Sequence, residues 1–473
     1  MINDPCPSTT GFLHEEARAC YEGLSTTAAE FFDYVLESDD RLEQLKHLAN
    51  DLPPWTRTYS TTQLTWPTFV GPKKLQQIKD AVEKVCDLVK SLPERIFDNE
   101  PRRLSDFYNY GDAALMELLL EQPNGIKGAV ARCDFIDGPA GFMCCEINMA
   151  PNVGGWESRF WEEKYLTNAV ISRFIADQGI HISHHDPFRT LCLHIVEDAS
   201  TNGVCSDGVL NLAVTCSTHS VPAEEGKRVA QDYSDFLRDV NVGLSGRVIF
   251  CTLADDLSVK NGNLFYGDQR IHAVLNHSAT ILPKQAYRCQ KAGTICLYNG
   301  PLTNMMSDKR NLALLSEFEH AGLFDEAERK IIHDHIPWSR VVVDGQTTYH
   351  GETVSLPNFL IAARDRLVLK LGIGLGGKEV YVGSFTPEDE WNQHVQEAVS
   401  SGGWMVQEHV DSHPYVYADG EGNVRPQNVV WGMFCFGSRY GGGYLRMLPK
   451  GMRRGVVNSG GGAVEGPILE ISQ

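Results

Sequence analysis

The chain has no long hydrophobic run. Apolar stretches such as Val341-Val342-Val343 are only a few residues long, whereas a membrane-spanning helix needs about 20 predominantly apolar residues. The first residues include Asp4 and lack a basic start followed by an apolar stretch, so we expect no secretion signal. These absences predict a cytoplasmic protein without a membrane partner.

Positive charge is scarce. The sequence has 42 lysine and arginine residues against 61 aspartate and glutamate residues, a formal net charge of −19. Such a charge repels nucleic acid in general, although a local basic pocket can still bind phosphates. We therefore expect small-molecule partners and no nucleic acid, and a homodimer is left open as an assembly.

No two cysteines form a CxxC pair, although the chain has 13 cysteines. Scattered cysteines in a large chain without a signal peptide are interpreted as reduced and mostly buried. His181, His184 and His185 with Asp186 also lack an accompanying CxxC pair, so a finger-type zinc site is not expected there. We interpret that segment as a polar linker.

The chain has 473 residues, a length that allows two or three domains. Its apolar residues recur with a clear period, which indicates secondary structure. Helices are expected over residues 11–50, 72–93 and 103–121. Residues 187–300 alternate short strands with helices, which is an α/β layer pattern. In that region we expect strands at residues 191–197, 246–252 and 273–275 and a helix at 222–240.

The later part of the chain returns to helices and then to strands. Helices are expected over residues 308–323 and 325–335, and the stretch from 429 to 469 is strand-rich. Between them, residues 357–410 predict a helix, a strand, a glycine loop, a strand, a helix and a strand.

Two short strands near position 140 carry polar residues on alternate positions. They flank Asp137-Gly138-Pro139-Ala140-Gly141, which has turn chemistry, so a hairpin is predicted. Glu146 and Asn148 share a strand face, and Asp134 on the partner strand can lie opposite. Mg²⁺ prefers carboxylate and amide oxygens, so these three are candidate metal ligands. Arg132, on the face of Asp134, is a candidate to stabilise charge in phosphoryl transfer.

A glycine-rich loop lies more than two hundred residues later in the chain. Glycines let backbone N–H groups approach phosphate oxygens. The loop follows a strand and precedes another, unlike a Rossmann loop or a P-loop, in which the glycines open a helix. The candidate nucleotide ligands here are Lys370, Gly372, Gly374, Gly376 and Gly377. By itself such a loop is equally compatible with a surface turn.

The strand at residues 404–410 ends in polar residues. Gln407 and Glu408 follow an apolar run, and such a strand end can offer backbone groups to adenine and a carboxylate to ribose. An ordinary strand with a polar end remains the alternative interpretation.

Together these motifs resemble the glutathionylspermidine synthase-like, circularly permuted ATP-grasp ligases. The resemblance runs in order over about residues 128–410, and five motifs in one order are more specific than any one of them. The matching residues are Arg132 and Asp134, then Glu146 and Asn148, then Asn299 to Lys309, then Lys370 with residues 372–377, and last Gln407 with Glu408. No amidase segment precedes them, so the bifunctional form of the family is not implied.

The resemblance implies a fold and a division of the chain. The fold is α+β and α/β, a circularly permuted ATP-grasp with mixed and antiparallel sheets. The implied regions are a helical region over residues 1–125, a metal-binding hairpin and helix over 126–180, a pre-ATP-grasp-like α/β substrate domain over 181–300 and the ATP-binding part over 301–473.

The resemblance also implies a reaction. ATP phosphorylates the carboxylate of an amino acid or short peptide, and an amine attacks the acyl-phosphate to give an amide, ADP and phosphate. In this scheme Arg132 stabilises the transferring group, Lys309 and Lys370 neutralise phosphates, and the acidic hairpin holds two Mg²⁺ ions. A small-molecule phosphotransferase and a nucleotide-binding scaffold without turnover are the alternatives.

Four further residues are weaker candidates for substrate binding. Trp156 follows the acidic hairpin, and Arg340 follows a predicted helix. Arg446 and Asn458 lie among the C-terminal glycines, on strands that would return toward the nucleotide. Packing or corner roles are the alternatives for Trp156 and Arg340.

Overall fold

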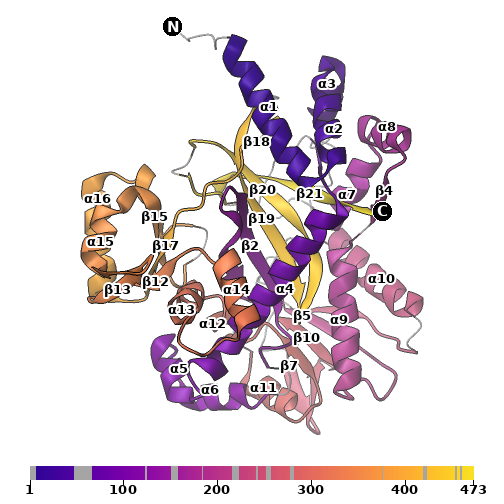
Figure 1. The fold of residues 1–473 in the computed structure, drawn as a ribbon. Coiled ribbons are helices and arrows are strands. Elements are labelled where there is room, and N and C mark those ends of the chain that lie inside the picture. Colours follow the sequence, from indigo (N-terminus) through magenta and orange to yellow (C-terminus); the bar gives the residue numbers. More distant parts are fainter. Residues whose placement is uncertain are drawn as a thin grey trace.

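An eight-stranded sheet runs through the centre of the molecule (Figure 1), in the order β1-β21-β20-β19-β2-β3, with β18 paired to β19 and β4 to β21. The structure is a computed structural model. It describes residues 7–46, 66–122, 125–150, 158–183, 185–215, 223–240, 243–251, 257–276, 282–374, 377–418, 423–452, 455–458 and 461–472.

The central sheet joins early and late parts of the chain. Strand β2 pairs with β3 on one side and with β19 on the other, all antiparallel, whereas β1 pairs with β21 in parallel. Its strands are β1 (Thr68–Val70), β2 (Val130–Gly138), β3 (Gly141–Asn148), β4 (His181–Ser183), β18 (Tyr415–Ala418), β19 (Val424–Phe436), β20 (Arg439–Pro449) and β21 (Val464–Ser472). The predicted hairpin is thus confirmed as β2 and β3.

Helix α4 (Pro72–Arg95) crosses this sheet and contacts β2, β3, β19, β20 and β21. It continues through Pro93 to Arg95, two residues beyond the end expected at residue 93. The segment expected as one helix over 11–50 is three: α1 (Pro7–Leu24), α2 (Thr26–Leu36) and α3 (Asp39–Lys46).

The helix expected over residues 103–121 is two helices, α5 (Pro101–Phe107) and α6 (Ala113–Leu120). Asn109 and Gly111 between them have positive φ angles, which end a right-handed helix, and the Asp112 side chain caps α6 by accepting from the Leu115 N–H. The break is therefore encoded locally.

A second, parallel sheet of order β11-β10-β5-β6 forms the α/β unit seen in magenta and pink in Figure 1. Its elements are α9 (Pro187–Thr201), β5 (Leu212–Thr215), α10 (Ala223–Asp239), β6 (Val248–Cys251), β10 (Ala273–Asn276), α11 (Lys284–Lys291) and β11 (Cys296–Tyr298). A three-stranded antiparallel sheet is attached to it, with β7 (Leu257–Lys260), β8 (Asn263–Tyr266) and β9 (Gln269–Ile271). Helices α7 (Ser158–Leu166) and α8 (Ala169–Gln178) precede this unit.

The strand expected at residues 191–197 is wrong, because this segment lies within helix α9. Leu191, Cys192, Ile195 and Val196 are all buried, at the spacing of one helix face. Asp186 caps the N-terminus and Pro187 occupies the first turn, two helix-start signals that outweigh the apolar run. The polar linker expected just before it contains strand β4, which pairs with β21, and His184 lies outside the described residues.

A third, antiparallel sheet of order β12-β17-β15-β16 has its own hydrophobic cluster, built around Leu360, Trp391 and Val406. Its elements are β12 (Ser339–Val341), α15 (Leu356–Ala362), β15 (Leu367–Leu371), β16 (Val380–Val382), α16 (Glu388–Ser401) and β17 (Trp404–Glu408). The expected order of elements over 357–410 is confirmed. A separate hairpin, β13 (Gln346–Tyr349) with β14 (Glu352–Ser355), precedes α15.

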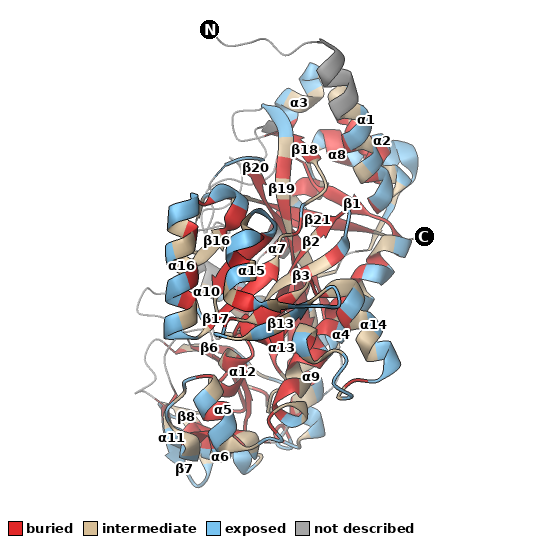
Figure 2. Cartoon of the chain, turned by 60° about the vertical axis from the view of Figure 1, so that its left-hand side comes forward, coloured by how far each residue is buried: buried red, intermediate tan, exposed pale blue. Residues whose placement is uncertain are grey.

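The connection to this third sheet is helical, through α12 (Pro301–Met305), α13 (Arg310–Phe318) and α14 (Glu326–His335). Both helices expected in this region are present, although α13 ends at Phe318 and not at residue 323. Asp325 with Glu328 forms a capping box at the start of α14. Figure 2 shows the buried residues gathered on the sheets and on the inner faces of the helices. Among the described helices, none combines the length and the apolar character that crossing a bilayer requires.

Candidate functional site

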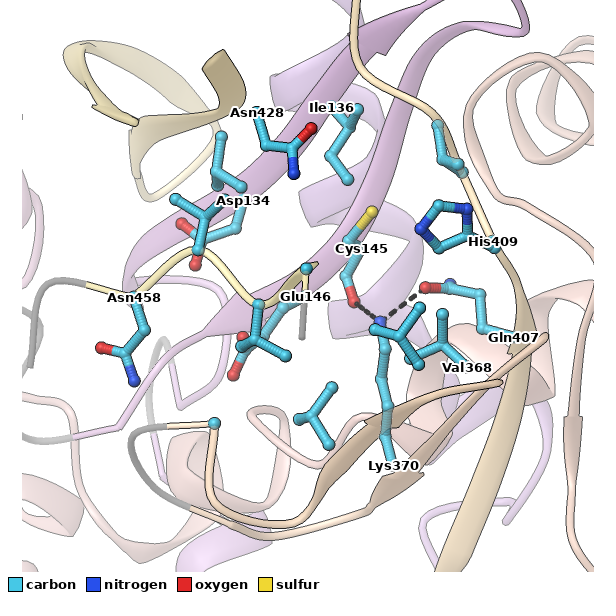
Figure 3. Close-up of a pocket in the computed structure, with 18 of the residues that line it drawn as sticks. Asp134, Ile136, Cys145, Glu146, Val368, Lys370, Gln407, His409, Asn428 and Asn458 are labelled. Atoms are coloured by element: carbon cyan, nitrogen blue, oxygen red, sulfur yellow. Dashed lines mark hydrogen bonds between the residues drawn. The ribbon is translucent and has the colours of Figure 1, made fainter. Parts of the chain in front are cut away.

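A cavity of about 280 Å³ lies between the central sheet and the third sheet (Figure 3). Strands β2, β3 and β20 contribute polar residues to one wall. Strands β15 and β17 and the loop after β15 form the opposite wall. The lining residues that the sequence had singled out are Arg132, Asp134, Glu146, Asn148, Lys309, Lys370, Gly374, Gly377, Gln407, Glu408, Arg446 and Asn458.

The hairpin register brings the four predicted residues of β2 and β3 together. Asp134 lies opposite Glu146, and Arg132 lies opposite Asn148. Asn148 Nδ2 donates a hydrogen bond of 3.2 Å to Asp134 Oδ2. Two carboxylates and one amide oxygen therefore share one end of the cavity.

A β-bulge in this hairpin was not foreseen. The register shifts between Asp134 and Phe135, so that Phe135 pairs with Cys144 and leaves Cys145 without a partner of its own. As a result Cys145 and Glu146, which strict alternation would direct to opposite faces, both line the cavity. Burial raises the pKa of the Cys145 thiol to about 11, so it is a neutral part of the wall.

Two arginines hold Asp134. Arg132 Nε donates to Asp134 Oδ1 at 3.1 Å, and Arg446 Nη2 lies 2.6 Å from the same oxygen. Burial raises the pKa of Asp134, but the two guanidinium groups outweigh that effect and keep its pKa below the usual value. Arg446 is buried, and among the residues that the structure describes its Nε has no hydrogen-bond partner. This corner carries a net positive charge suited to an anion.

Two lysines enter the cavity from other segments. Lys309 precedes α13, and its Nζ lies 3.1 Å from Glu146 Oε1 and 3.3 Å from the Gly374 carbonyl oxygen. Lys370 Nζ donates to Gln407 Oε1 at 2.7 Å and to the Cys145 carbonyl oxygen at 3.0 Å, as Figure 3 shows. Burial lowers the pKa of Lys370, so an anion in the cavity would be a favourable partner for its ammonium group.

Gln407 is fully buried and both ends of its amide are occupied. Its Oε1 accepts from Lys370, and its Nε2 donates to Ser339 Oγ at 3.1 Å. Gln407 therefore orients Lys370 in this structure. The neighbouring Glu408 ends β17 with its side chain at the cavity and partly exposed.

The glycine-rich loop lies over the cavity in part. Gly374 and Gly377 line it, and Gly377 has a φ angle of 68°. A side chain at Gly377 would lie 2.9 Å from Val456 Cγ1 and 3.4 Å from Asn458 Nδ2, so this loop approaches the C-terminal loop closely. Gly372, also a predicted nucleotide ligand, follows directly after β15 and is not one of the lining residues, and Gly376 lies outside the described residues.

Of the four weaker candidates, two line the cavity. Arg446 and Asn458 do so, whereas Arg340 points its guanidinium at the β13–β14 hairpin, donating to Thr347 Oγ1 at 2.8 Å and to the Thr348 carbonyl oxygen at 3.0 Å. Trp156 lies outside the described residues. The third motif of the resemblance begins at Asn299, whose side chain binds the backbone of β2 at Val130, so its contacts are structural.

Sequence reasoning missed the apolar end of the cavity. It is lined by Ile136, Val368, Val380, Val382, Phe385 and Val410, with His409 beside them. Val368 shares a strand face with Lys370, and Val380 shares one with Val382, so alternation along β15 and β16 could have indicated them. This end can receive a flat apolar group, while the opposite end carries the charges.

The metal-binding prediction concerns two carboxylates and an amide. Within the described residues no group of three or more histidine, cysteine, aspartate and glutamate side chains is arranged as a metal site. Asp134, Glu146 and Asn148 nevertheless offer the hard oxygen donors that Mg²⁺ takes together with phosphate oxygens and water.

Comparison with known proteins shows the fold alone. No family model and no curated protein matches the chain. Among solved structures, a glutathione synthetase-like effector from Globodera pallida superimposes with a TM-score of 0.54 at 12% identity, covering 91% of this chain and 96% of that chain. A chain from Methylobacillus flagellatus named after gamma-glutamylcysteine synthetase gives a TM-score of 0.39 at 13% identity over 80% and 86%, a likeness that carries no argument.

Proposed function

We propose that this chain is an ATP-dependent carboxylate–amine ligase with a circularly permuted ATP-grasp fold. One observation carries the proposal: a single cavity joins the acidic hairpin near position 140 to two lysines and a glycine loop from beyond position 300. The fold shared with a glutathione synthetase-like effector supports the same class of reaction. The acid would be an amino acid or a short peptide.

The nucleotide would lie along the cavity from its apolar to its charged end. Adenine would pack among Val368, Val382 and the neighbouring apolar side chains, next to the end of β17. Glu408 would accept hydrogen bonds from ribose hydroxyl groups. Lys309, Lys370 and the N–H groups of the glycine loop would neutralise the phosphates.

Mg²⁺ fits the charged end by the chemistry of its donors. Asp134, Glu146 and Asn148 would hold it, and the ion would supply charge neutralisation for the phosphates during transfer. In this structure both carboxylates form ion pairs with side chains. Glu146 pairs with Lys309, and Asp134 pairs with Arg132 and Arg446. Bound phosphates would offer the lysine and the two arginines other anions to pair with, and the carboxylates could then bind the metal.

The corner formed by Arg132 and Arg446 would bind the reacting carboxylate. A carboxylate oxygen would attack the γ-phosphorus of ATP, and the bond from that phosphorus to the ADP oxygen would break. The amine would then form a bond to the acyl carbon, phosphate would leave with the electron pair of the broken C–O bond, and the amine would lose a proton. Preorganised guanidinium groups would stabilise the charge that develops in both steps.

The decisive experiment measures ADP release with Mg–ATP against amino acids and short peptides, singly and in pairs, with mass spectrometry of the products. A ligase gives ADP release that needs two substrates, with a product lighter by one water than their sum. A phosphorylated product without an amine would instead indicate a phosphotransferase. ATP binding without turnover on any pair would overturn the ligase proposal in favour of a scaffold.

A further inference from the structure

The carboxylate of Glu408 is held by the protein from one side. Tyr349 Oη donates a hydrogen bond of 2.8 Å to Glu408 Oε1, and His350 Nε2 lies 3.9 Å from the same oxygen. Within the described residues, no hydrogen bond is made to Oε2. Since Glu408 lines the cavity, one of its oxygens is fixed and the other is available to a ligand.

Tyr349 belongs to a hairpin that is itself anchored. Arg340 on β12 is buried, and its guanidinium donates to both Thr347 and Thr348 on strand β13. Trp338 Nε1 donates to the Thr348 carbonyl oxygen at 2.9 Å. Because β12 pairs with β17, these bonds tie the hairpin to the strand that ends in Glu408.

The ring of Tyr349 is packed on several sides. Its centroid lies 4.5 Å from that of Phe359 and 5.1 Å from that of Trp338, and the Arg366 guanidinium lies 5.6 Å over the ring. Burial and the bond to Glu408 both raise the pKa of Tyr349, so the phenol stays protonated and donates at neutral pH. The hydroxyl group thus has a defined position.

We propose that Tyr349 is a positioning residue that fixes Glu408 for binding the ribose hydroxyl groups of the nucleotide, with Arg340 anchoring the hairpin that carries it. The inference rests on the proposed function, because it assumes that ATP binds in this cavity. A carboxylate that is already oriented loses less side-chain freedom when it accepts a hydroxyl group, so the site favours nucleotides that have one. The sugar, and not only the base and phosphates, then contributes to affinity.

The test compares ATP with 2′,3′-dideoxy-ATP, each with Mg²⁺, by calorimetry on the full chain. Wild type should bind ATP more tightly. Tyr349→Phe keeps the packed ring and removes the hydroxyl group, so Glu408 must be ordered by the ligand. This substitution should weaken ATP binding by roughly threefold to tenfold, the usual cost of ordering one side chain on binding, and leave dideoxy-ATP almost unchanged. Arg340→Lys loses the planar guanidinium group that anchors the hairpin. It should therefore reduce the ratio of the affinity for ATP to the affinity for dideoxy-ATP.

The matched control is Thr353→Ala, on the second strand of the same hairpin. Thr353 is exposed and pairs with Thr348, so its side chain lies on the hairpin face away from Tyr349, and the ratio of the affinities for ATP and dideoxy-ATP should not change. If Tyr349→Phe weakens both nucleotides equally, its role is structural and the inference is wrong. Wild type that binds both nucleotides equally also overturns it while leaving the ATP site intact, whereas wild type that binds neither overturns the proposed function as well.

Discussion

The two carboxylates of the cavity, Asp134 and Glu146, differ in their burial and in the cations that they contact. Asp134 is buried between two guanidinium groups, whereas the side chain of Glu146 keeps 32% of its surface exposed and has one lysine beside it. Glu146 can therefore change partner with less loss of burial and pairing than Asp134 can. We expect Glu146 to be the carboxylate that responds first when a metal–nucleotide complex binds.

Glu146→Ala should remove metal-dependent turnover while leaving the fold intact. The side chain is half-buried at a cavity wall, so truncation creates no core cavity. The expected loss of kcat is at least a hundredfold, of the size found when one preorganised charge interaction in a transition state is removed. The assay is ADP release as a function of Mg²⁺ concentration, with thermal unfolding as the check on the fold.

Asp411→Ala is the control for that variant, since this carboxylate also lines the cavity but its side chain is 80% exposed at the rim. It should retain turnover close to wild type. Turnover by Glu146→Ala at the wild-type rate would contradict the metal-site assignment.

Lys370→Met should weaken ATP binding by roughly tenfold to a hundredfold, because charge-assisted hydrogen bonds to anions contribute about 1.5–3 kcal/mol. Methionine keeps most of the buried volume and removes only the ammonium group. Calorimetry with ATP in the absence of an acid or amine substrate isolates this effect. Unchanged nucleotide affinity would exclude Lys370 from the phosphate site.

At the scale of elements, the glycine loop has a structural part and a ligand-facing part. A side chain at Gly372 would collide with Asp308 Oδ1 and would lie 2.8 Å from Arg310 Nε and 2.9 Å from the Gly403 carbonyl oxygen. Asp308 and Arg310 form a buried ion pair of 2.6 Å, so neither can move cheaply. Among the described residues, the three atoms nearest to a side chain at Gly374 all belong to the flexible side chain of Glu379.

The two glycines should therefore respond oppositely to alanine. Gly372→Ala should lower the free energy of unfolding by about 1–3 kcal/mol, the usual cost of overpacking. Gly374→Ala should leave stability almost unchanged and weaken ATP binding, because this glycine faces the cavity. Denaturant unfolding and calorimetry on the same two variants check both halves. Equal stability of the two variants would contradict the division.

The β-bulge in strand β3 also belongs to the scale of elements, and it decides which polar groups reach the cavity. The register shift at Cys145 places the Cys145 carbonyl oxygen, which accepts a hydrogen bond from Lys370, next to Glu146 at the cavity wall. Bulges of this kind re-aim side chains next to binding sites. Nothing in the run Phe142-Met143-Cys144-Cys145-Glu146 marks the shift, because it depends on pairing with β2.

At the scale of the whole molecule, the two walls of the cavity belong to different hydrophobic clusters. The residues around Leu360 and Trp391 form one cluster, separate from the large cluster of the central sheet. A ligand that contacts both walls would link them. Binding to the folded state stabilises it by about 2.7 kcal/mol at a ligand concentration of 100 times Kd.

Mg–ATP should therefore slow amide hydrogen exchange on both walls, in β2 and β3 as well as in β15 and β17. In the Glu146→Ala variant the nucleotide should still protect β15 and β17 but protect β3 much less, since the metal link to the hairpin is lost. Hydrogen-exchange mass spectrometry with and without nucleotide resolves these segments. Protection confined to one wall in the wild type would contradict a nucleotide site between the two sheets.

Much of the local structure and the charged residues of the cavity were predicted from the sequence, whereas its apolar end was not. Alternation on two strands placed Arg132, Asp134, Glu146 and Asn148 on one hairpin face, and the order of elements around the glycine loop was correct. Residues 191–197 were misjudged because a short apolar run has no period long enough to separate strand from helix. There the capping residues Asp186 and Pro187 were the better signal.

The sequence by itself determined which local elements form and which of their residues share a face, because backbone periodicity and turn chemistry act over a few residues. Only the tertiary structure decided which distant segments meet. It brought Arg446 to Asp134, Lys370 to the Cys145 backbone, and Arg340 to the hairpin of Tyr349 instead of the cavity. Such contacts depend on strand order and register across hundreds of residues, which the burial of the whole core selects and no local pattern contains.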